Sequence, residues 1–345
     1  MPYSLNDPVH VFVLDCTQVP HVHDAAVEQE VLRDCAQVHL VHISQDNEFR
    51  PYCADASALI VWHHVELTAN IIRCLTKTRI IVRNGVGFEN IDVSAAAARG
   101  IAVSNVPDYG TEEVADHAIT LSLALNRQLR LLIEDVRAGN WHWETAWRCR
   151  RVRGQIFGVV GCGRIGTATA LRAKALGYAV RFYDPLLPCG YEKAIGVVRD
   201  ESLEGLLRAA DVVSLHVPLN EQTRHLIGRC ELRTMKREAY LINTARGAVV
   251  SYEALAEALA EGWIAGAGLD VLEHEPQGLD LVARFPSCIL TPHSAFYSQE
   301  SILEMRRSSA DLVRRAILHG ALRNVVNGVQ HLGESPLPIS NGTIS

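Results

Sequence analysis

The sequence predicts an α/β protein built from two doubly wound domains, each a parallel sheet covered by helices. Apolar strand-like runs alternate with helical patterns almost throughout the chain, which is the pattern of βαβ units. The chain has 345 residues, more than a single hydrophobic core usually serves. A glycine-rich turn near the middle separates one series of strands from a second.

The first series occupies the N-terminal third of the chain. Strands are predicted at 9–15, 58–63, 79–85 and 101–107, and helical spacing at 67–77. One long helix is predicted to follow, capped by Thr111 and continuing to Arg137, with Gly139 ending it. Glu112 and Glu113 suit the first turn of this helix, where the helix dipole favours negative charge.

The second series begins with "GQIFGVVGCGRIG" at 154–166. Further strands are predicted at 178–184, 211–218, 239–245, 265–271 and 287–292. Residues 298–320 form one amphipathic pattern, with Ser298 as its cap and Gly320 as its stop. Residues 331–345 are polar and contain proline, so we expect a loose tail there.

Composition excludes several classes of protein. The formal net charge of −6 argues against a nucleic-acid-binding protein, which needs a basic surface. The stretch "WRCRRVR" at 147–153 is either a solvated face or a local basic patch. No apolar run reaches the ~18 residues of a membrane span, and no signal peptide is visible at the N-terminus.

The cysteines and histidines suggest a compartment and exclude a simple metal motif. Nine cysteines are scattered without a CxxC pair, which suits free thiols and a cytoplasmic location. "HVH" at 21–23 and "HH" at 63–64 resemble ligand pairs. Neither has a carboxylate or cysteine set at ligand spacing, so we expect no metal site.

The glycine-rich turn predicts a dinucleotide site. Gly161, Gly163 and Gly166 follow an apolar strand and open a helix, where glycines let the backbone approach a pyrophosphate at the helix N-terminus. Asp184 lies 18 positions beyond Gly166, at the end of the next strand. A carboxylate there accepts from a ribose 2′-hydroxyl and repels a 2′-phosphate. We therefore predict NAD rather than NADP, although Arg181 lies nearby.

Ionisable residues follow three later strands of the same predicted sheet. Arg246 stands in "NTARG", Asp270 and Glu275 in "GLDVLEHEP", and His293 in "LTPHSAFYS". The carboxyl edge of a doubly wound sheet faces its ligand crevice. An arginine there suits a carboxylate, and a histidine paired with a carboxylate suits proton transfer. The alternative for His293 is a structural histidine at a strand end.

Together these motifs resemble the D-isomer-specific 2-hydroxyacid dehydrogenases. The resemblance rests on the glycine loop with Asp184, "HVPLNEQTRHLIG", "NTARG", "LDVLEHEP" and "TPHSAFYS", and covers about residues 8–327. "VRNGVGFENIDV", "NVPDYGTEEVADHA" and "HSAFYSQES" most resemble the C-terminal-binding-protein branch and its bacterial relatives. The fold implied is a Rossmann NAD-binding domain at 109–297, with a discontinuous flavodoxin-like substrate domain at 1–108 and 298–330.

The resemblance implies roles for individual residues. Arg246 would bind the substrate carboxylate, His293 would be the acid/base, and Glu275 would orient it. The other residues implied to contact the substrate are His63, Arg83, the backbone of Val86 and Gly87, and Phe296. The branch often has tryptophan where Phe296 stands, so the resemblance leaves the preferred substrate open. The residues implied to contact the cofactor are Gly161, Gly163, Arg164, Ile165, Gly166, Asp184, His216, Val217, Pro218, Thr244, Ala245, Arg246, Asp270 and His293.

The implied function is hydride transfer between NADH and the C2 carbon of a small 2-oxo acid. A homodimer is implied by the resemblance alone, with no nucleic-acid or membrane partner. Animal members of the branch act as NAD-responsive corepressors, so the alternative is an NAD(H)-sensing protein that binds partner peptides. Turnover of NADH with a 2-oxo acid distinguishes the two.

Overall fold

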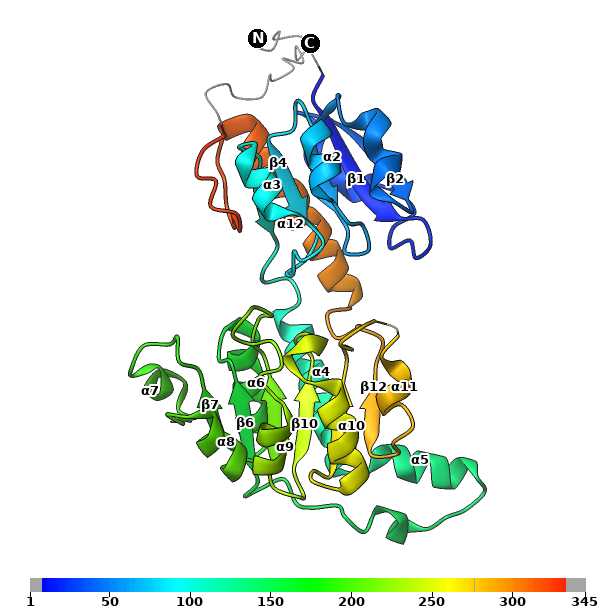
Figure 1. Ribbon diagram of the computed structural model, residues 1–345, viewed down its shortest axis with the longest axis vertical. Coiled ribbons are helices and arrows are strands. Elements are labelled where there is room, and N and C mark those ends of the chain that lie inside the picture. Colours follow the sequence, from blue (N-terminus) through cyan, green and yellow to red (C-terminus); the bar gives the residue numbers. More distant parts are fainter. Residues whose placement is uncertain (1–7, 276, 333–345) are drawn as a thin grey trace. The chain divides into compact units, whose positions relative to one another are not determined.

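The computed structural model describes residues 8–275 and 277–332, and its chain divides into two compact units (Figure 1). Within the described residues, unit 1 comprises the chain up to Tyr109 together with the part from Ser298 onward, and unit 2 comprises Gly110–Tyr297. Each unit contains one parallel sheet, so the predicted fold class is confirmed. The predicted tail lies outside the described residues from 333 onward.

Unit 1 contains a five-stranded parallel sheet in the order β2-β1-β3-β4-β5. This is the flavodoxin-like order, as expected for the substrate domain. All six residues of β3 are buried, as expected for a parallel strand that helices cover on both sides. The strands are β1 (His10–Cys16), β2 (Gln37–Ile43), β3 (Ala56–Val61), β4 (Ile80–Arg83) and β5 (Ala102–Asn105).

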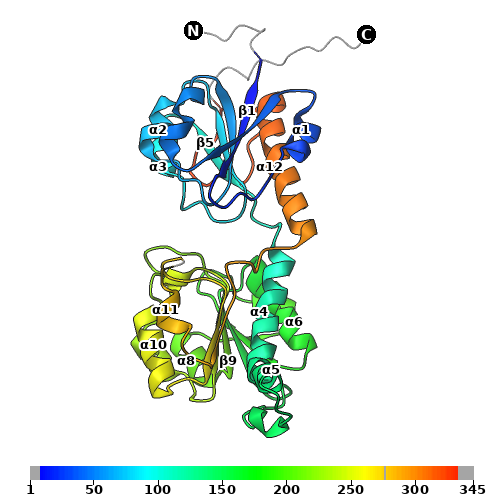
Figure 2. The ribbon, with the colours of Figure 1, turned by 90° about the vertical axis from the view of Figure 1, so that its right-hand side faces the viewer.

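Helices cover both faces of this sheet. Figure 2 shows α1 (Ala26–Leu32) and α12 (Gln299–His319) on one face, with α2 (Ala69–Cys74) and α3 (Val93–Ala98) on the other. A short 3₁₀ helix, η1 (Asp46–Tyr52), follows β2. Because α12 packs on α1, β3 and β4, the last helix of the chain completes a core formed mostly by its first hundred residues.

The predicted limits of α12 are confirmed. The Ser298 side chain accepts a hydrogen bond from the backbone N–H of Ser301, and Gly320 ends the helix with a φ of 62°. A left-handed residue at this position favours glycine because no Cβ meets the preceding turn.

Unit 2 contains a seven-stranded parallel sheet in the order β12-β11-β10-β9-β6-β7-β8. Figure 2 shows α4 and α6 on one face and α8, α10 and α11 on the other. The strands are β6 (Ile156–Val160), β7 (Ala179–Tyr183), β8 (Val198–Arg199), β9 (Val212–Leu215), β10 (Tyr240–Asn243), β11 (Gly266–Leu269) and β12 (Cys288–Leu290). The helices are α4 (Thr111–Asn126), α5 (Leu129–Arg137), η2 (Trp143–Ala146), α6 (Arg164–Ala175), α7 (Tyr191–Ile195), α8 (Leu203–Ala209), α9 (Arg229–Thr234), η3 (Gly247–Val249), α10 (Tyr252–Glu261) and α11 (Leu279–Val282).

The prediction of one helix from Thr111 to Arg137 was wrong. The chain forms α4 and α5, separated at Gln128, whose φ of 50° is left-handed. Thr111 is not the cap, because Gly110 occupies that position and no side chain caps the helix. The apolar spacing continues across the break, but α4 buries one face whereas α5 buries no residue. The sequence pattern alone could not reveal this change of surroundings.

Two strands were not predicted from the sequence. Polar and apolar residues are mixed along β2, so they form no apolar run, and most of them are only partly buried. β8 has two residues. Both lie at the edge of a sheet, where one side of a strand has no neighbour and burial is weaker.

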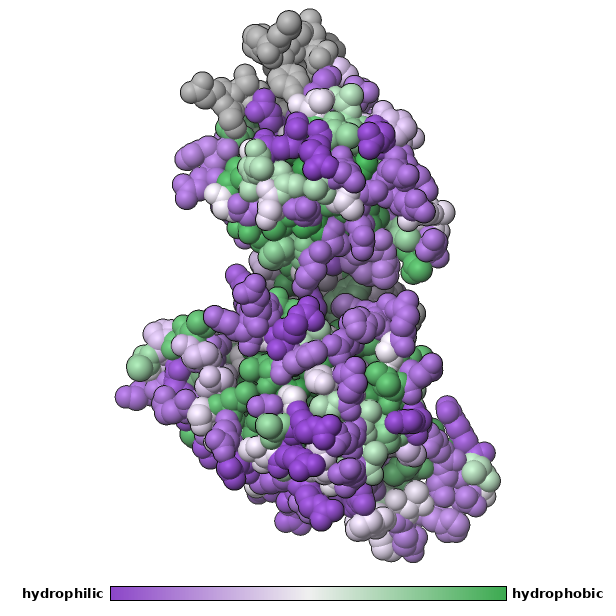
Figure 3. Space-filling model, viewed as in Figure 1, coloured by the Kyte–Doolittle hydropathy of each residue, from purple (hydrophilic) through white to green (hydrophobic). Residues whose placement is uncertain are grey.

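The surface of the molecule mixes hydrophilic residues with scattered hydrophobic ones on the face in view (Figure 3). None of the helices in the described part of the chain has the length and apolar character that crossing a membrane requires.

One buried ion pair joins the two segments of unit 1. Glu28 of α1 is fully buried, and its carboxylate accepts hydrogen bonds from Arg306 Nε at 2.8 Å and Nη2 at 2.7 Å. The next residue of α12, Arg307, has its guanidinium 3.9 Å from the carboxylate of Glu30 in α1, and both side chains are more than half exposed.

We predict that Arg306→Ala destabilises unit 1 by about 3–5 kcal/mol, because it leaves the Glu28 carboxylate buried without its partner. Arg307→Ala is the matched control and should cost less than about 1 kcal/mol. Urea unfolding followed by circular dichroism measures both. Equal losses in the two variants would contradict the prediction.

Candidate active site

The predicted site residues of unit 2 follow the carboxyl ends of its strands. β6 lies between β9 and β7, and the chain passes from β7 and β8 on one side to β9 on the other. The order of strands therefore reverses beside β6, and in doubly wound sheets ligands bind outside the carboxyl ends at such a point. The glycine loop follows β6, and His216 follows β9.

Two positions of the glycine loop require glycine, because a side chain there would collide with neighbouring backbone atoms. A Cβ on Gly166 would lie 2.0 Å from the carbonyl oxygen of Gly161. Gly161 has a φ of 85°, and a Cβ there would lie 2.9 Å from the carbonyl oxygen of His216. By contrast, nothing lies within 4 Å of a Cβ on Gly163, the residue that precedes α6. The loop therefore leaves open space at the helix N-terminus, as a pyrophosphate requires.

Asp184 follows β7 and contacts the glycine loop directly. Its carboxylate accepts hydrogen bonds from the N–H of Cys162 at 2.9 Å and from the N–H of Leu186 at 3.0 Å. Arg181 does not compete for this position, because its guanidinium is paired with Asp200 through two hydrogen bonds. This arrangement supports the predicted preference for a ribose hydroxyl over a 2′-phosphate.

The residues after β9 and β10 border the same edge of the sheet. The His216 ring nitrogen Nε2 lies 2.8 Å from the Ser214 hydroxyl, and burial lowers the pKa of His216 to about 3. Val217 and Pro218 follow, with Val217 packed close to Gly161. Thr244 is buried, and its hydroxyl has no hydrogen-bond partner in the described part of the chain.

An unpartnered buried hydroxyl is costly unless a ligand satisfies it. Thr244 and the open space at Gly163 are therefore two independent features of this chain that suit a bound dinucleotide. Ala245 follows Thr244 in the chain, and its N–H donates to the Asn243 side chain at 3.0 Å. Arg164 and Ile165 form the first turn of α6.

His293 is paired with Glu275, as predicted. Nδ1 of His293 lies 2.8 Å from Oε2 of Glu275, and both side chains are partly exposed. The other carboxylate oxygen accepts from the N–H of Leu272 at 3.1 Å. This pairing fixes the tautomer of His293.

The pKa of Glu275 lies below its ordinary value. Burial acts to raise this pKa, but the hydrogen bond and charge of His293, the N–H of Leu272 and the charge of Arg246 together outweigh burial. Glu275 is therefore ionised at neutral pH. The positive charge of Arg246 is close enough to Glu275 to help lower its pKa. The Arg246 guanidinium also donates to the carbonyl oxygen of Ala245 at 2.8 Å. The structure thus brings Arg246, Glu275 and His293 together.

Asp270 has a positioning role that the sequence did not reveal. It is buried, and its carboxylate accepts hydrogen bonds from the Thr291 hydroxyl at 2.5 Å, the N–H of Ser294 at 2.9 Å and the N–H of Ala295 at 2.9 Å. The carbonyl oxygen of Asp270 accepts from the N–H of His293 at 2.7 Å. His293 itself has a φ of 50°, so Asp270 holds the loop in an uncommon backbone conformation.

Two further residues of this cluster were missed by the sequence analysis. The Thr291 hydroxyl donates a hydrogen bond to Asp270 and accepts one from His117 Nε2 at 2.9 Å. His117 belongs to α4, 174 residues earlier in the chain. His117 lies within the stretch "NVPDYGTEEVADHA", but that stretch did not reveal its contact with the loop, because only the packing of α4 on the sheet brings the two together. Phe296 follows on this loop, with its ring 6.4 Å from the His293 ring in an edge-on contact.

The remaining predicted substrate residues belong to unit 1. His63 follows β3, and Arg83 ends β4, where its Nη1 donates to the carbonyl oxygen of Asn84 at 2.9 Å. The Arg83 guanidinium covers Gly85, since a Cβ there would lie 1.7 Å from Nη1. The carbonyl oxygen of Val86 accepts from the Asn105 side chain at 2.6 Å, which fixes the turn that contains Gly87.

Comparison with known proteins shows which family the chain resembles. Residues 119–295 match the family model described as "D-isomer specific 2-hydroxyacid dehydrogenase, NAD binding domain". A glyoxylate reductase of Korarchaeum cryptofilum is 43% identical over 263 residues, which cover 74% of this chain and 78% of that protein. A D-3-phosphoglycerate dehydrogenase of Methanocaldococcus jannaschii is 33% identical over 89% of this chain, and the match spans only 58% of that relative's length.

The fold agrees with a solved structure of the same kind. The crystal structure of a glyoxylate reductase from Paecilomyes thermophila has a TM-score of 0.83 and 33% identity, covering 92% of this chain and 98% of that one. The match to the family's NAD-binding domain includes the glycine loop, Asp184, Arg246, Glu275 and His293. The chain therefore belongs to the D-isomer-specific 2-hydroxyacid dehydrogenase family, and its cofactor is NAD.

Proposed function

We propose that this protein reduces small 2-oxo acids with NADH to the corresponding D-2-hydroxy acids, and catalyses the reverse oxidation. The observation that carries this proposal is the hydrogen bond between His293 and Glu275, 2.8 Å long, at the carboxyl edge of a dinucleotide-binding sheet and near Arg246. A base, its orienting carboxylate and a carboxylate-binding arginine are the groups that such a reaction needs.

When bound, the nicotinamide supplies the hydride, which is chemistry that no side chain provides. The residues that would hold the cofactor are those of the glycine loop, Asp184, the segment from His216 to Pro218, Thr244 and Ala245. Asp270 is a further predicted contact, although the hydrogen bonds it makes in the structure go to the loop that carries His293. We therefore assign Asp270 to positioning of that loop as well.

His293 is proposed to transfer the proton. In the reduction, its ring gives a proton to the oxygen on C2 while the ionised Glu275 stabilises the charged ring. In the oxidation, the neutral ring takes that proton back. Arg246 would bind the substrate carboxylate with its planar guanidinium, whose paired N–H groups match two carboxylate oxygens.

The substrate is proposed to be a small 2-oxo acid such as glyoxylate, hydroxypyruvate or pyruvate. Two of the relatives above are named glyoxylate reductases, which makes glyoxylate the first acid to test. The predicted substrate contacts are His63, Arg83, the backbone of Val86 and Gly87, and Phe296. Neither the Val86 nor the Gly87 N–H donates to another group in the described residues, so both remain available to a carboxylate.

Three finer assignments also remain proposals: the branch of the family, the cellular compartment and the oligomeric state. The stretches around Arg83, Asp108 and Phe296 support the C-terminal-binding-protein-like branch, whereas the relatives compared above are named as reductases and dehydrogenases. All nine cysteines are free thiols, which supports a reducing cytoplasm.

A homodimer is supported by apolar surface on one part of unit 2. α5 and the segment after it expose large hydrophobic side chains, and clusters of this kind on a soluble protein mark interaction surfaces. The exposed residues are Leu129, Ile133, Val136, Trp141, Trp143 and Trp147. We propose that a second copy of the chain covers them.

We predict that His293→Ala lowers kcat for glyoxylate reduction by about 10²–10⁴-fold while NADH still binds. Oxidation of NADH at saturating substrate gives kcat, and NADH fluorescence gives the affinity. Loss of NADH binding together with turnover would show that His293 is structural. Tight NADH binding by the wild type, without turnover of any 2-oxo acid, would favour the NAD(H)-sensing alternative.

Glu275→Gln should keep the hydrogen bond to His293 but remove the charge. Because a neutral amide does not stabilise the charged ring, we expect the alkaline limb of kcat/KM for 2-oxo acid reduction to move to lower pH. Glu273→Gln is the control, since Glu273 pairs with His225 instead. An unchanged profile in Glu275→Gln would contradict the proposed role.

Asp184→Asn should shift the ratio of kcat/KM for NADH over NADPH toward NADPH by about tenfold or more, because the repulsion of a 2′-phosphate is lost. The amide oxygen can still accept from Cys162. Glu201→Gln removes an exposed charge beyond β8 and should leave the ratio unchanged. A shift of the same size in both variants would point to general surface charge.

Replacing both Trp143 and Trp147 with serine should yield monomers, because the apolar surface around α5 is reduced. Size-exclusion chromatography with light scattering measures the mass. Leu186→Ser removes an apolar residue that is still more exposed, at 90%, elsewhere in unit 2, and should leave the dimer intact. A monomeric wild type would refute the proposed dimer.

A further inference from the structure

Three histidines from two separate segments meet in unit 1. His21 follows β1, and His63 and His64 follow β3. One ring nitrogen from each lies within 4.8 Å of those of the other two. The His21 ring lies 4.3 Å from the His63 ring and 5.2 Å from the His64 ring, measured between centroids, and the His63 and His64 rings are 4.1 Å apart.

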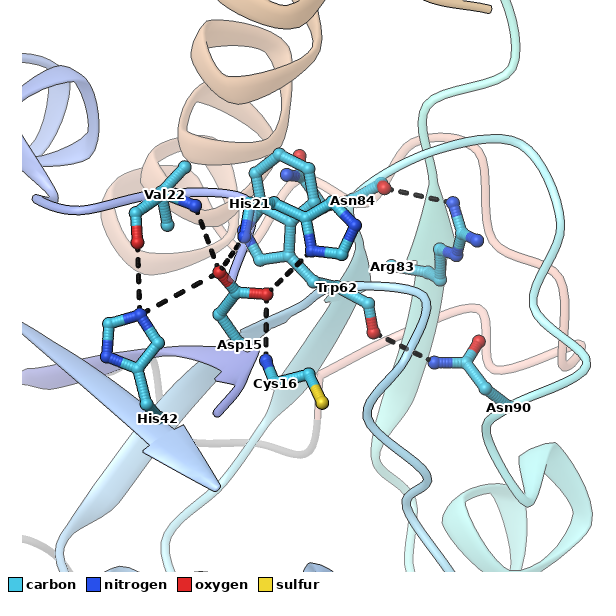
Figure 4. Close-up of polar contacts among 9 residues, drawn as sticks. All are labelled: Asp15, Cys16, His21, Val22, His42, Trp62, Arg83, Asn84 and Asn90. Atoms are coloured by element: carbon cyan, nitrogen blue, oxygen red, sulfur yellow. Dashed lines mark hydrogen bonds and ion pairs between the residues drawn. The ribbon is translucent and has the colours of Figure 1, made fainter. Parts of the chain in front are cut away.

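A buried carboxylate orients the first of these histidines. Asp15 at the end of β1 is fully buried, and Nδ1 of His21 lies 2.9 Å from its Oδ1 (Figure 4). The other ring nitrogen of His21, Nε2, is thereby left as the acceptor. The His21 ring also stacks on the buried Trp62 ring, with centroids 4.9 Å apart and planes 11° from parallel. Both contacts hold the ring in one orientation.

Backbone groups hold the buried Asp15 carboxylate in place. It accepts hydrogen bonds from the N–H groups of Cys16 at 2.8 Å, His21 at 2.6 Å and Val22 at 3.0 Å. His42 lies on the other side, with Nε2 at 3.0 Å from the carbonyl oxygen of Val22 and 3.8 Å from Oδ2 of Asp15 (Figure 4). The Asp15 carboxylate is therefore fixed beside Nδ1 of His21.

The cluster occupies the place in unit 1 where a doubly wound sheet binds ligands. β1 lies between β2 and β3, so the strand order reverses between β1 and β3. The two strands are paired in parallel, with Leu14 opposite Val61. The loops that carry the histidines follow the carboxyl ends of these strands. A site outside the carboxyl ends at such a reversal is the expected ligand position of this architecture.

We propose that His21, His63 and His64 bind a divalent transition-metal ion of the Zn²⁺ class, with Asp15 as the residue that positions His21. Three imidazoles are a donor set for Zn²⁺ and its neighbours, whereas Mg²⁺ and Ca²⁺ require oxygen ligands. A carboxylate bonded to the second nitrogen of a ligating histidine is a recurrent feature of such sites, where it fixes the tautomer.

The geometry needs only side-chain adjustment to accept an ion. Tetrahedral coordination with bonds of about 2.0–2.1 Å puts ligand nitrogens about 3.3 Å apart. His63 and His64 stand on a loop rather than in a strand, and His64 is exposed, so their rings can close on an ion held at His21. Three protein ligands leave a fourth position for water or an anionic oxygen.

This assignment is independent of the proposed hydride transfer, since it rests on unit 1 alone. It gives His63 a ligand role in addition to the substrate contact predicted above. It also replaces the expectation that "HVH" and "HH" carry no metal site, because the fold brings the two stretches together as one set of three imidazoles.

The test is Co²⁺ binding to untagged, full-length protein freed of metal with a chelator and then dialysed. We expect one equivalent to bind with the visible absorption of a nitrogen-ligated ion, and Zn²⁺ to displace it. His21→Gln, His63→Gln and His64→Gln should each weaken binding at least about tenfold, and Asp15→Asn about 10- to 100-fold.

His23→Gln is the matched control, because His23 lies two residues from His21 but outside the cluster. It should bind Co²⁺ like the wild type, and circular dichroism must show that each variant is folded. If Asp15→Asn fails to fold, the three histidine variants still decide the question.

The proposal is overturned if no saturable binding occurs, or if His23→Gln abolishes binding while His21→Gln preserves it. A thiolate-to-cobalt charge-transfer band would also overturn it, since that band would assign the ion to the exposed Cys189 or Cys230.

Discussion

Every paired strand in both sheets runs parallel to its neighbours, and the rest of the structure depends on this constraint. Parallel strands need crossover connections, and these are right-handed, so all carboxyl ends of a sheet come to one edge. The central strands, such as β3, are buried and apolar, whereas the edge strands β2 and β8 are only partly buried. Polar chemistry is therefore confined to the loops at the edge, where residues from distant segments meet.

A buried aspartate at the end of a strand organises a histidine loop in each unit. Asp15 follows the apolar part of β1 and accepts from the backbone of His21 and Val22. Asp270 follows β11 and accepts from Ser294 and Ala295, beside His293. A buried carboxylate has several lone pairs to satisfy, and backbone N–H groups of the next loop satisfy them without a second charge. The same physical arrangement thus positions the proposed acid/base in unit 2 and the proposed metal ligand in unit 1.

Local patterns in the sequence were sufficient where one segment decides the outcome. The glycine loop, the cap and stop of α12 and most strands follow from residues that are adjacent in the chain. The pairing of His293 with Glu275 was inferred through the family resemblance, because eighteen residues separate the two. The break between α4 and α5 was not predictable, since the apolar spacing is the same on both sides of Gln128 and only the loss of burial differs.

The sequence by itself determined the fold class, the dinucleotide loop and the identity of the groups at each strand end, because hydrophobic periodicity and turn chemistry are local properties. Tertiary structure decided which of those groups meet. His117 contacts Thr291, 174 positions away, and Arg306 contacts Glu28, 278 positions away. Asp15 contacts His21 after β1, whereas His63 and His64 lie after β3. Such contacts depend on strand order and helix packing, which no local pattern encodes.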